Sequence, residues 1–119
     1  MILQHPLNIY ALVHFRLLQP DKPDRGAIIA AVCEALKLER HQVNMSAGRR
    51  YYNVLGRHLC WKLIKESEPL ISYDGIITLF GGGNHTTVMH GISAIEIRIK
   101  NEPAISDLYK SVKKKLHMA

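Results

Sequence analysis

The chain has 119 residues, 47% of them hydrophobic and 22% charged, which is enough for one globular domain with its own core. The chain has 16 Lys and Arg but only 10 Asp and Glu, and nearly all of the excess positive charge lies after residue 48. No stretch approaches the roughly 18 apolar residues of a membrane span, and no basic segment precedes an apolar core, so we expect a cytoplasmic protein with no membrane contact. The charge favours a phosphate-bearing partner.

Residues 6–18 form a strongly apolar stretch. The pattern fits a helix, and alternate residues are also apolar as in a strand; helix is the preferred interpretation. The next segment, 19–24, holds two prolines and two aspartates, which predicts a turn or linker. We therefore expect residues 1–26 to be an apolar segment with a Pro-rich linker and residues 27–119 to be a separate domain. Residues 1–18 are candidates for packing on that domain, for a homodimer or for a protein partner.

Further along the chain, apolar residues recur at helical spacing in several segments. The spacing predicts a helix over 27–38, a short helical turn over 39–43 and the longest helix over 49–65. A break at 102–103 is followed by a last helix over 105–116. Helix is preferred to strand in every segment, so we predict an all-α fold, a helix bundle.

Two cysteines, Cys33 and Cys60, lie on predicted helix faces far apart in the sequence. Reduced core thiols are a better interpretation than a disulfide in a cytoplasmic protein.

The run Phe80–His90, FGGGNHTTVMH, is the most informative part of the chain. Three successive glycines mark a tight turn, because each would weaken a regular element. Asn84 is a good N-cap for the helix that follows, and Ser72 can cap a short helix before the turn. Two helices joined by a glycine turn, the second beginning with small polar residues, predict a helix-turn-helix.

This run resembles the signature F-G-[GK]-R-[DN]-H-T-T-V of the C-terminal DNA-binding domain of the bacterial replication initiator DnaA. The resemblance extends over about residues 27–116 as a helix pattern, and it implies a Trp-repressor-like helix bundle containing the helix-turn-helix. The connection over residues 65–71 is several residues longer than is usual in the family, and there are two further departures near the turn. Gly83 stands where the family has a basic residue, and Ile77 stands where the family usually has glycine.

The resemblance also implies which side chains contact DNA. The second helix of the motif would read base edges in the major groove, and a basic loop would reach the minor groove. The base-reading candidates are Asn84, His85, Thr86, Thr87, Arg49 and Arg50. Basic side chains on the same face are candidates for phosphate contact: Arg57, Lys62, Lys65 and His90. The alternative is that the polar residues at 84–87 only cap a helix.

These residues predict sequence-specific binding of double-stranded DNA, in replication initiation or its regulation, without ATPase activity. The chain is not expected to be an enzyme or to hold a cofactor. No spacing typical of a metal site occurs, and the glycine run lacks the Lys-Ser/Thr of a nucleotide-binding loop. An alternative is a protein-interaction or dimerisation module with a degenerate helix-turn-helix, for which Gly83 is the best argument. RNA binding is a weaker alternative, because few aromatic residues are available for base stacking.

Overall fold

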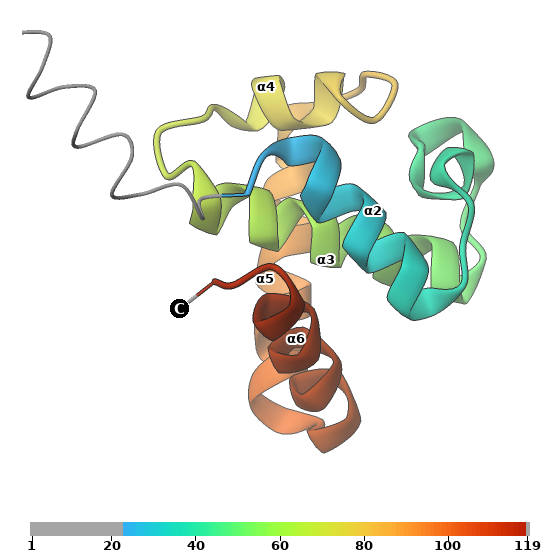
Figure 1. Ribbon diagram of the computed structural model, residues 1–119. Coiled ribbons are helices and arrows are strands. Elements are labelled where there is room, and N and C mark those ends of the chain that lie inside the picture. The colour runs from blue at the N-terminus through green and yellow to red at the C-terminus, as the bar shows by residue number, and fades with distance from the viewer. Residues whose placement is uncertain (1–22, 119) are drawn as a thin grey trace, which may run out of the picture.

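The computed structural model describes residues 23–118, and the expectations for residues 1–22 lie outside that part (Figure 1). The predicted all-α fold is confirmed: every regular element in the described part is helical. The elements in chain order are α2 (Arg25–Leu36), the 3₁₀ turns η1 (Arg40–Val43) and η2 (Met45–Ala47), α3 (Tyr51–Ser67), α4 (Tyr73–Thr78), α5 (His85–Asn101) and α6 (Pro103–Lys115).

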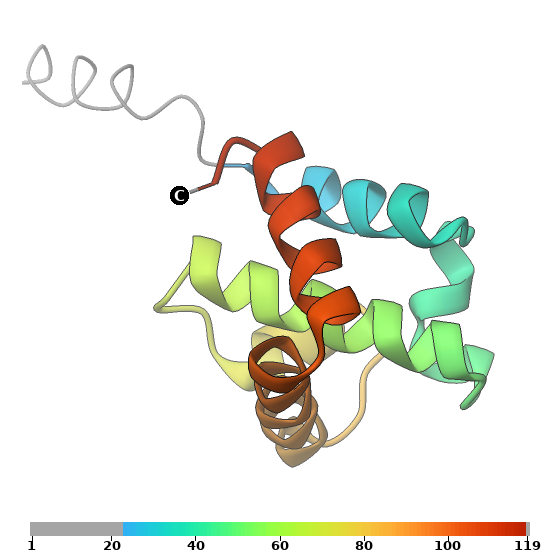
Figure 2. The ribbon, with the colours of Figure 1, turned by 90° about the horizontal axis from the view of Figure 1, so that it is seen from below.

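Helix α3 forms the centre of the bundle, and the other helices pack around it (Figures 1 and 2). Helix α2 lies along one side of α3, and α5 crosses α3 on the other side. Helix α6 then returns from the end of α5 to pack on α2. The short helix α4 lies at the edge of the bundle beside the beginning of α5, which places the turn of the predicted motif at the surface.

The helix ends follow local signals in the sequence. The Asp24 side chain accepts a hydrogen bond from Ala27 N at 2.7 Å, and Ser72 Oγ accepts one from Gly75 N at 2.9 Å. Pro103 begins α6, a position where its missing N–H costs nothing. The first described helix was predicted over 27–38 but begins and ends two residues earlier, because Asp24 is its N-cap and Lys37 takes the left-handed conformation after it.

The long central helix was predicted from residue 49 but begins at Tyr51, so the basic pair before it belongs to a loop. Arg50 is extended, with φ −62° and ψ 146°, and its side chain makes no capping bond. This two-residue shift matters for the site, because it takes Arg49 and Arg50 off the regular helix.

The core centres on Trp61 and Phe80, both fully buried with their rings edge to face at 6.0 Å. Gly91 lets α5 cross α3 at this point. A Cβ at Gly91 would lie 2.6 Å from the Trp61 ring and 2.8 Å from the His58 ring, which leaves no room for any larger residue. The crossing fixes the position of α5 relative to the rest of the bundle.

Cys33 and Cys60 are buried and free, as predicted. Burial raises the pKa of both thiols, which keeps them protonated.

Candidate nucleic-acid interface

The predicted helix-turn-helix is present, with α4 as its first helix and α5 as its second. Between them Gly81, Gly82 and Gly83 have φ values of 103°, 88° and 142°, a region that other residues rarely adopt. Gly82 N donates to Ile77 O at 2.9 Å, which closes the end of α4. The three glycines therefore reverse the chain in a few residues and deliver the start of α5 to the surface.

The first turn of α5 exposes the polar side chains that the sequence singled out. Asn84 is the N-cap as predicted: its Oδ1 accepts from Thr86 N at 2.9 Å and from Thr86 Oγ1 at 2.8 Å. Asn84, His85 and Thr86 are exposed, and Thr87 is half-buried. His85 Nδ1 lies 3.8 Å from Asp74 Oδ1 on α4. Capping uses the side-chain carbonyl oxygen of Asn84 and leaves its amide group without a hydrogen bond to the described residues, and the side chains of His85 and Thr86 are exposed beside it.

His90 is also exposed on α5, five residues beyond His85. It follows Thr86 by four residues, so these two side chains lie on the same side of the helix.

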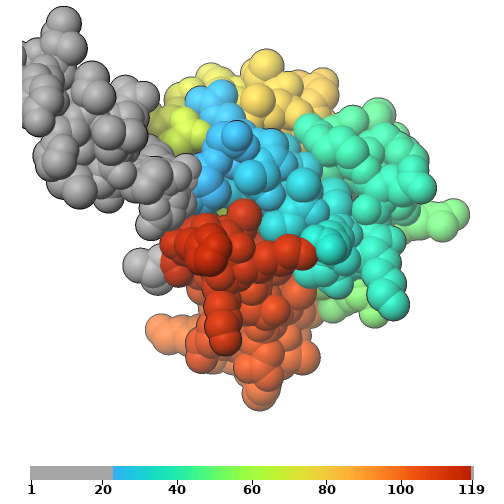
Figure 3. Space-filling view, in the orientation of Figure 1, coloured from blue at the N-terminus to red at the C-terminus, as the bar shows by residue number. Residues whose placement is uncertain are grey.

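A second group of exposed basic residues lies in the loop between η2 and α3. Gly48 has a φ of 91°, and Arg49 and Arg50 follow it. Both arginines are exposed, and neither guanidinium makes a hydrogen bond or ion pair in the part of the chain that the structure describes. This loop forms one flank of the molecule, at the right in Figure 3. Its two cations are free to meet a polyanion.

The structure gives Arg57 a different place from the one the sequence predicted. Its side chain is 5% exposed, and its guanidinium donates to Val43 O at 3.0 Å, Asn44 O at 2.7 Å and Gly48 O at 3.0 Å. Burial lowers its pKa. All three acceptors are in the loop that carries Arg49 and Arg50. We therefore leave Arg57 out of the phosphate contacts, because it holds the loop from inside.

Arg40 joins the same loop to the helix-turn-helix, and the sequence analysis missed it. Its guanidinium donates to Asn44 Oδ1 at 2.7 Å and to Leu79 O at 2.9 Å, and lies over the Phe80 ring at 5.2 Å. Met45 N donates to Phe80 O at 2.8 Å. The loop and the glycine turn are thus one connected surface, although about 30 residues separate them in sequence.

The two candidate lysines on α3 already have partners inside the domain. Lys62 Nζ lies 2.9 Å from a carboxylate oxygen of Glu96 and 3.3 Å from one of Glu66. Lys65 Nζ donates to Ile71 O at 2.5 Å and lies over the Tyr73 ring. Lys65 borders a hollow that His85 also lines, whereas Lys62 is paired with the far half of α5. Of the two, only Lys65 is close to the base-reading residues.

Within residues 23–118, no three His, Cys, Asp or Glu side chains gather in a way that could hold a metal ion. Within the same residues, no helix is both long and apolar enough to cross a membrane.

A family model described as "Bacterial dnaA protein helix-turn-helix" matches residues 26–95, which include α2 through most of α5. This chain belongs to the bacterial DnaA helix-turn-helix family. A protein named "Chromosomal replication initiator protein DnaA", from Rhodopseudomonas palustris (strain BisA53), is 30% identical over 105 residues. The match covers 84% of this chain but 21% of that protein, so the chain spans about a fifth of its length. No solved structure matches the chain.

The two departures from the DnaA signature lie against one another. A Cβ built at Gly83 would meet Ile77 Cδ1 at 3.0 Å, and Ile77 is 2% exposed. The isoleucine side chain therefore occupies space that a side chain at position 83 would need. A larger residue at position 83 would therefore require the Ile77 side chain to shift, so the packing at these two positions is coupled.

Proposed function

We propose that this chain binds double-stranded DNA in a sequence-dependent manner through its DnaA-type helix-turn-helix. The observation that carries the proposal is the exposure of Asn84, His85 and Thr86 at the first turn of α5. Their amide, imidazole and methyl groups suit base edges in the major groove, and the free backbone N–H groups of the helix start favour a neighbouring phosphate. Thr87 and His90 extend this contact along the helix, to a base edge and to a phosphate.

Arg49 and Arg50 are proposed to enter the adjacent minor groove. Exposed arginines on a loop suit a narrow groove, where the negative potential is high. The loop is held rigidly to the glycine turn by Arg40 and to α3 by Arg57, so its position relative to α5 is fixed before DNA arrives. A preformed loop loses less conformational entropy on binding. Lys65 remains a proposed phosphate contact, and Lys62 a weaker one.

The proposed role is in replication initiation or its regulation, and it rests on the family and on the name of the R. palustris relative. We propose that the chain acts by binding alone, without ATPase activity, because its glycine run is not followed by the Lys-Ser/Thr that nucleotide phosphates require. A chromosomal DNA ligand implies action in the cytoplasm.

The experiment compares two variants that each remove two positive charges. Binding to a random-sequence duplex is measured by fluorescence anisotropy over a salt series. Arg49→Ala with Arg50→Ala should weaken binding strongly and lower the slope of log K against log salt by about two. The control, Lys110→Ala with Lys114→Ala on α6, should change binding much less, since both lysines lie on another helix. Equal losses in the two variants, or the lack of salt-dependent binding, would contradict the proposal.

A further inference from the structure

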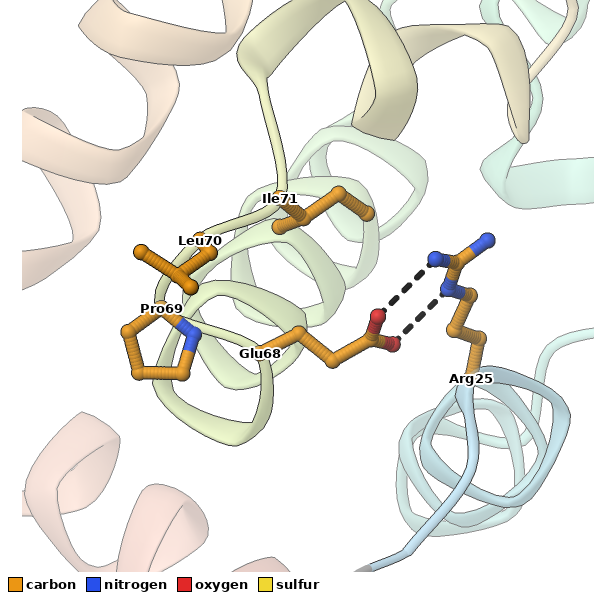
Figure 4. Close-up of a pocket in the computed structure, with 5 residues that line it drawn as sticks. All are labelled: Arg25, Glu68, Pro69, Leu70 and Ile71. Atoms are coloured by element: carbon orange, nitrogen blue, oxygen red, sulfur yellow. Dashed lines mark hydrogen bonds and ion pairs between the residues drawn. The ribbon is translucent and has the colours of Figure 1, made fainter.

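The connection between α3 and α4 carries an unusual apolar surface. Leu70 is 99% exposed, its neighbour Pro69 is also exposed and Ile71 is half-buried; we call these three residues the Leu70 ridge. A hollow of about 370 Å³ lies beside the ridge, between it and the ion pair of Arg25 with Glu68 (Figure 4). A second hollow is lined by Leu70, Ile71 and Tyr73 and also by the polar side chains of Lys65, Asp74 and His85. A fully exposed leucine between two hollows is a poor arrangement in water.

The chain enters the described domain next to this ridge. Pro23 O accepts a hydrogen bond from Ser67 Oγ at 3.1 Å, which ties the entering chain to the end of α3. Two residues later, Arg25 makes two 2.8 Å hydrogen bonds to the Glu68 carboxylate, at the edge of the first hollow. The ridge begins at the residue after Glu68, so the entry point and the apolar surface are neighbours.

The segment that precedes the entry point has the chemistry to cover the ridge. Residues 6–18 include four leucines, Ile9, Val13 and Phe15, and contain one arginine and no acidic residue. Only residues 19–22 separate this segment from Pro23, and four residues of extended chain reach at most about 14 Å. A segment tethered so closely is present at an effective concentration on the order of millimolar, so even a weak apolar contact is populated.

We propose that residues 6–18 dock on the Leu70 ridge of their own chain. The segment buries Leu70 and fills the first hollow, where the charged side chains of Arg25 and Glu68 are paired with each other. The other exposed apolar residues fit this role less well. Tyr51 and Tyr52 carry polar hydroxyl groups beside the basic loop, and Ile97 lies on α5, away from the point of entry. The proposal does not depend on DNA binding.

The test uses the full chain with a nitroxide spin label on His14→Cys, which adds a third thiol while Cys33 and Cys60 stay buried. In ¹⁵N-labelled protein, docking predicts that the amide signals of residues 68 and 70–73 lose most of their intensity. Leu70→Asp should restore these signals, and its own spectrum reports that the domain is still folded. Ile97→Asp, at another exposed apolar residue, is the matched control and should leave the broadening unchanged.

Three results would overturn the proposal. The first is that the amide signals of residues 68 and 70–73 remain sharp. The second is that their broadening persists in Leu70→Asp, which would show that the segment is tethered near the ridge without contacting it. A mixture of ¹⁵N-labelled unmodified chain with unlabelled spin-labelled chain provides the third. Broadening of the ridge in that mixture would show that a second copy supplies the segment.

Discussion

Substitution of Arg57 distinguishes a structural role for this side chain from a role in DNA contact. Arg57→Met keeps the apolar stem and removes three hydrogen bonds from a charged donor to the carbonyls of Val43, Asn44 and Gly48. A hydrogen bond to a charged group contributes about 1.5–3 kcal/mol, and the carbonyls nearest the surface regain water. We therefore expect the free energy of unfolding to fall by about 3–5 kcal/mol, as for other broken buried charge networks.

The assay is urea unfolding with the slope m held common to all variants, so that a shift of the midpoint reports stability. Arg57→Lys is the informative second variant, because it keeps the charge but cannot span three carbonyls. Both variants should be destabilised, and Lys114→Met, an exposed charge removed from α6, should change stability by less than about 0.5 kcal/mol. The reasoning would be refuted if Arg57→Met kept wild-type stability while the salt slope of DNA binding fell by about one, the signature of a lost phosphate contact.

Two further predictions concern pH and the glycine turn. Burial, with Arg57 and Arg98 nearby, lowers the pKa of His58 to about 4. Between about pH 6.5 and pH 4 the unfolded chain therefore binds a proton that the folded chain does not. The free energy of unfolding should fall by about 1–2 kcal/mol as the pH drops through this window, after allowance for solvent screening. Urea midpoints across this range should fall less in His58→Gln; an equal fall would assign the effect to other groups. Gly83→Ala should cost about 1–2 kcal/mol through its φ of 142°, and less in an Ile77→Val background that lacks Cδ1. Strict additivity of the two changes in stability in that double-mutant cycle would contradict a packing conflict between the side chains at positions 77 and 83.

The helix-turn-helix could be predicted from the sequence because its signals are local. Three glycines, the Asn84 cap and the Ser72 cap each act within a few residues, and the structure has all of them in the expected places. The helix boundaries near residues 25 and 51 were less predictable. Each depends on which of two neighbouring residues ends the extended chain, and helical periodicity alone does not distinguish them.

The roles of individual basic residues could not be predicted in the same way. Arg49, Arg50 and Arg57 are alike in sequence, and only the packing of α3 turns Arg57 inward against the loop. Lys62 could be paired with Glu66 from the i,i+4 spacing, but its other partner, Glu96, is 34 residues away. The contact of Arg40 with Leu79 spans 39 residues and has no local signal at all. Long-range partners decide which cations remain free for DNA.

The most direct test of the central claim is selection of binding sites from a random pool of double-stranded DNA. Wild-type protein, His85→Ala and His117→Ala are run together, and the last is a control because it removes another exposed histidine beyond α6. We predict that wild type and His117→Ala enrich the same short motif, and that His85→Ala loses preference at one or two positions, worth roughly 1–3 kcal/mol each. An unchanged motif in His85→Ala, or no enriched motif with the wild type, would contradict sequence-dependent recognition by the start of α5.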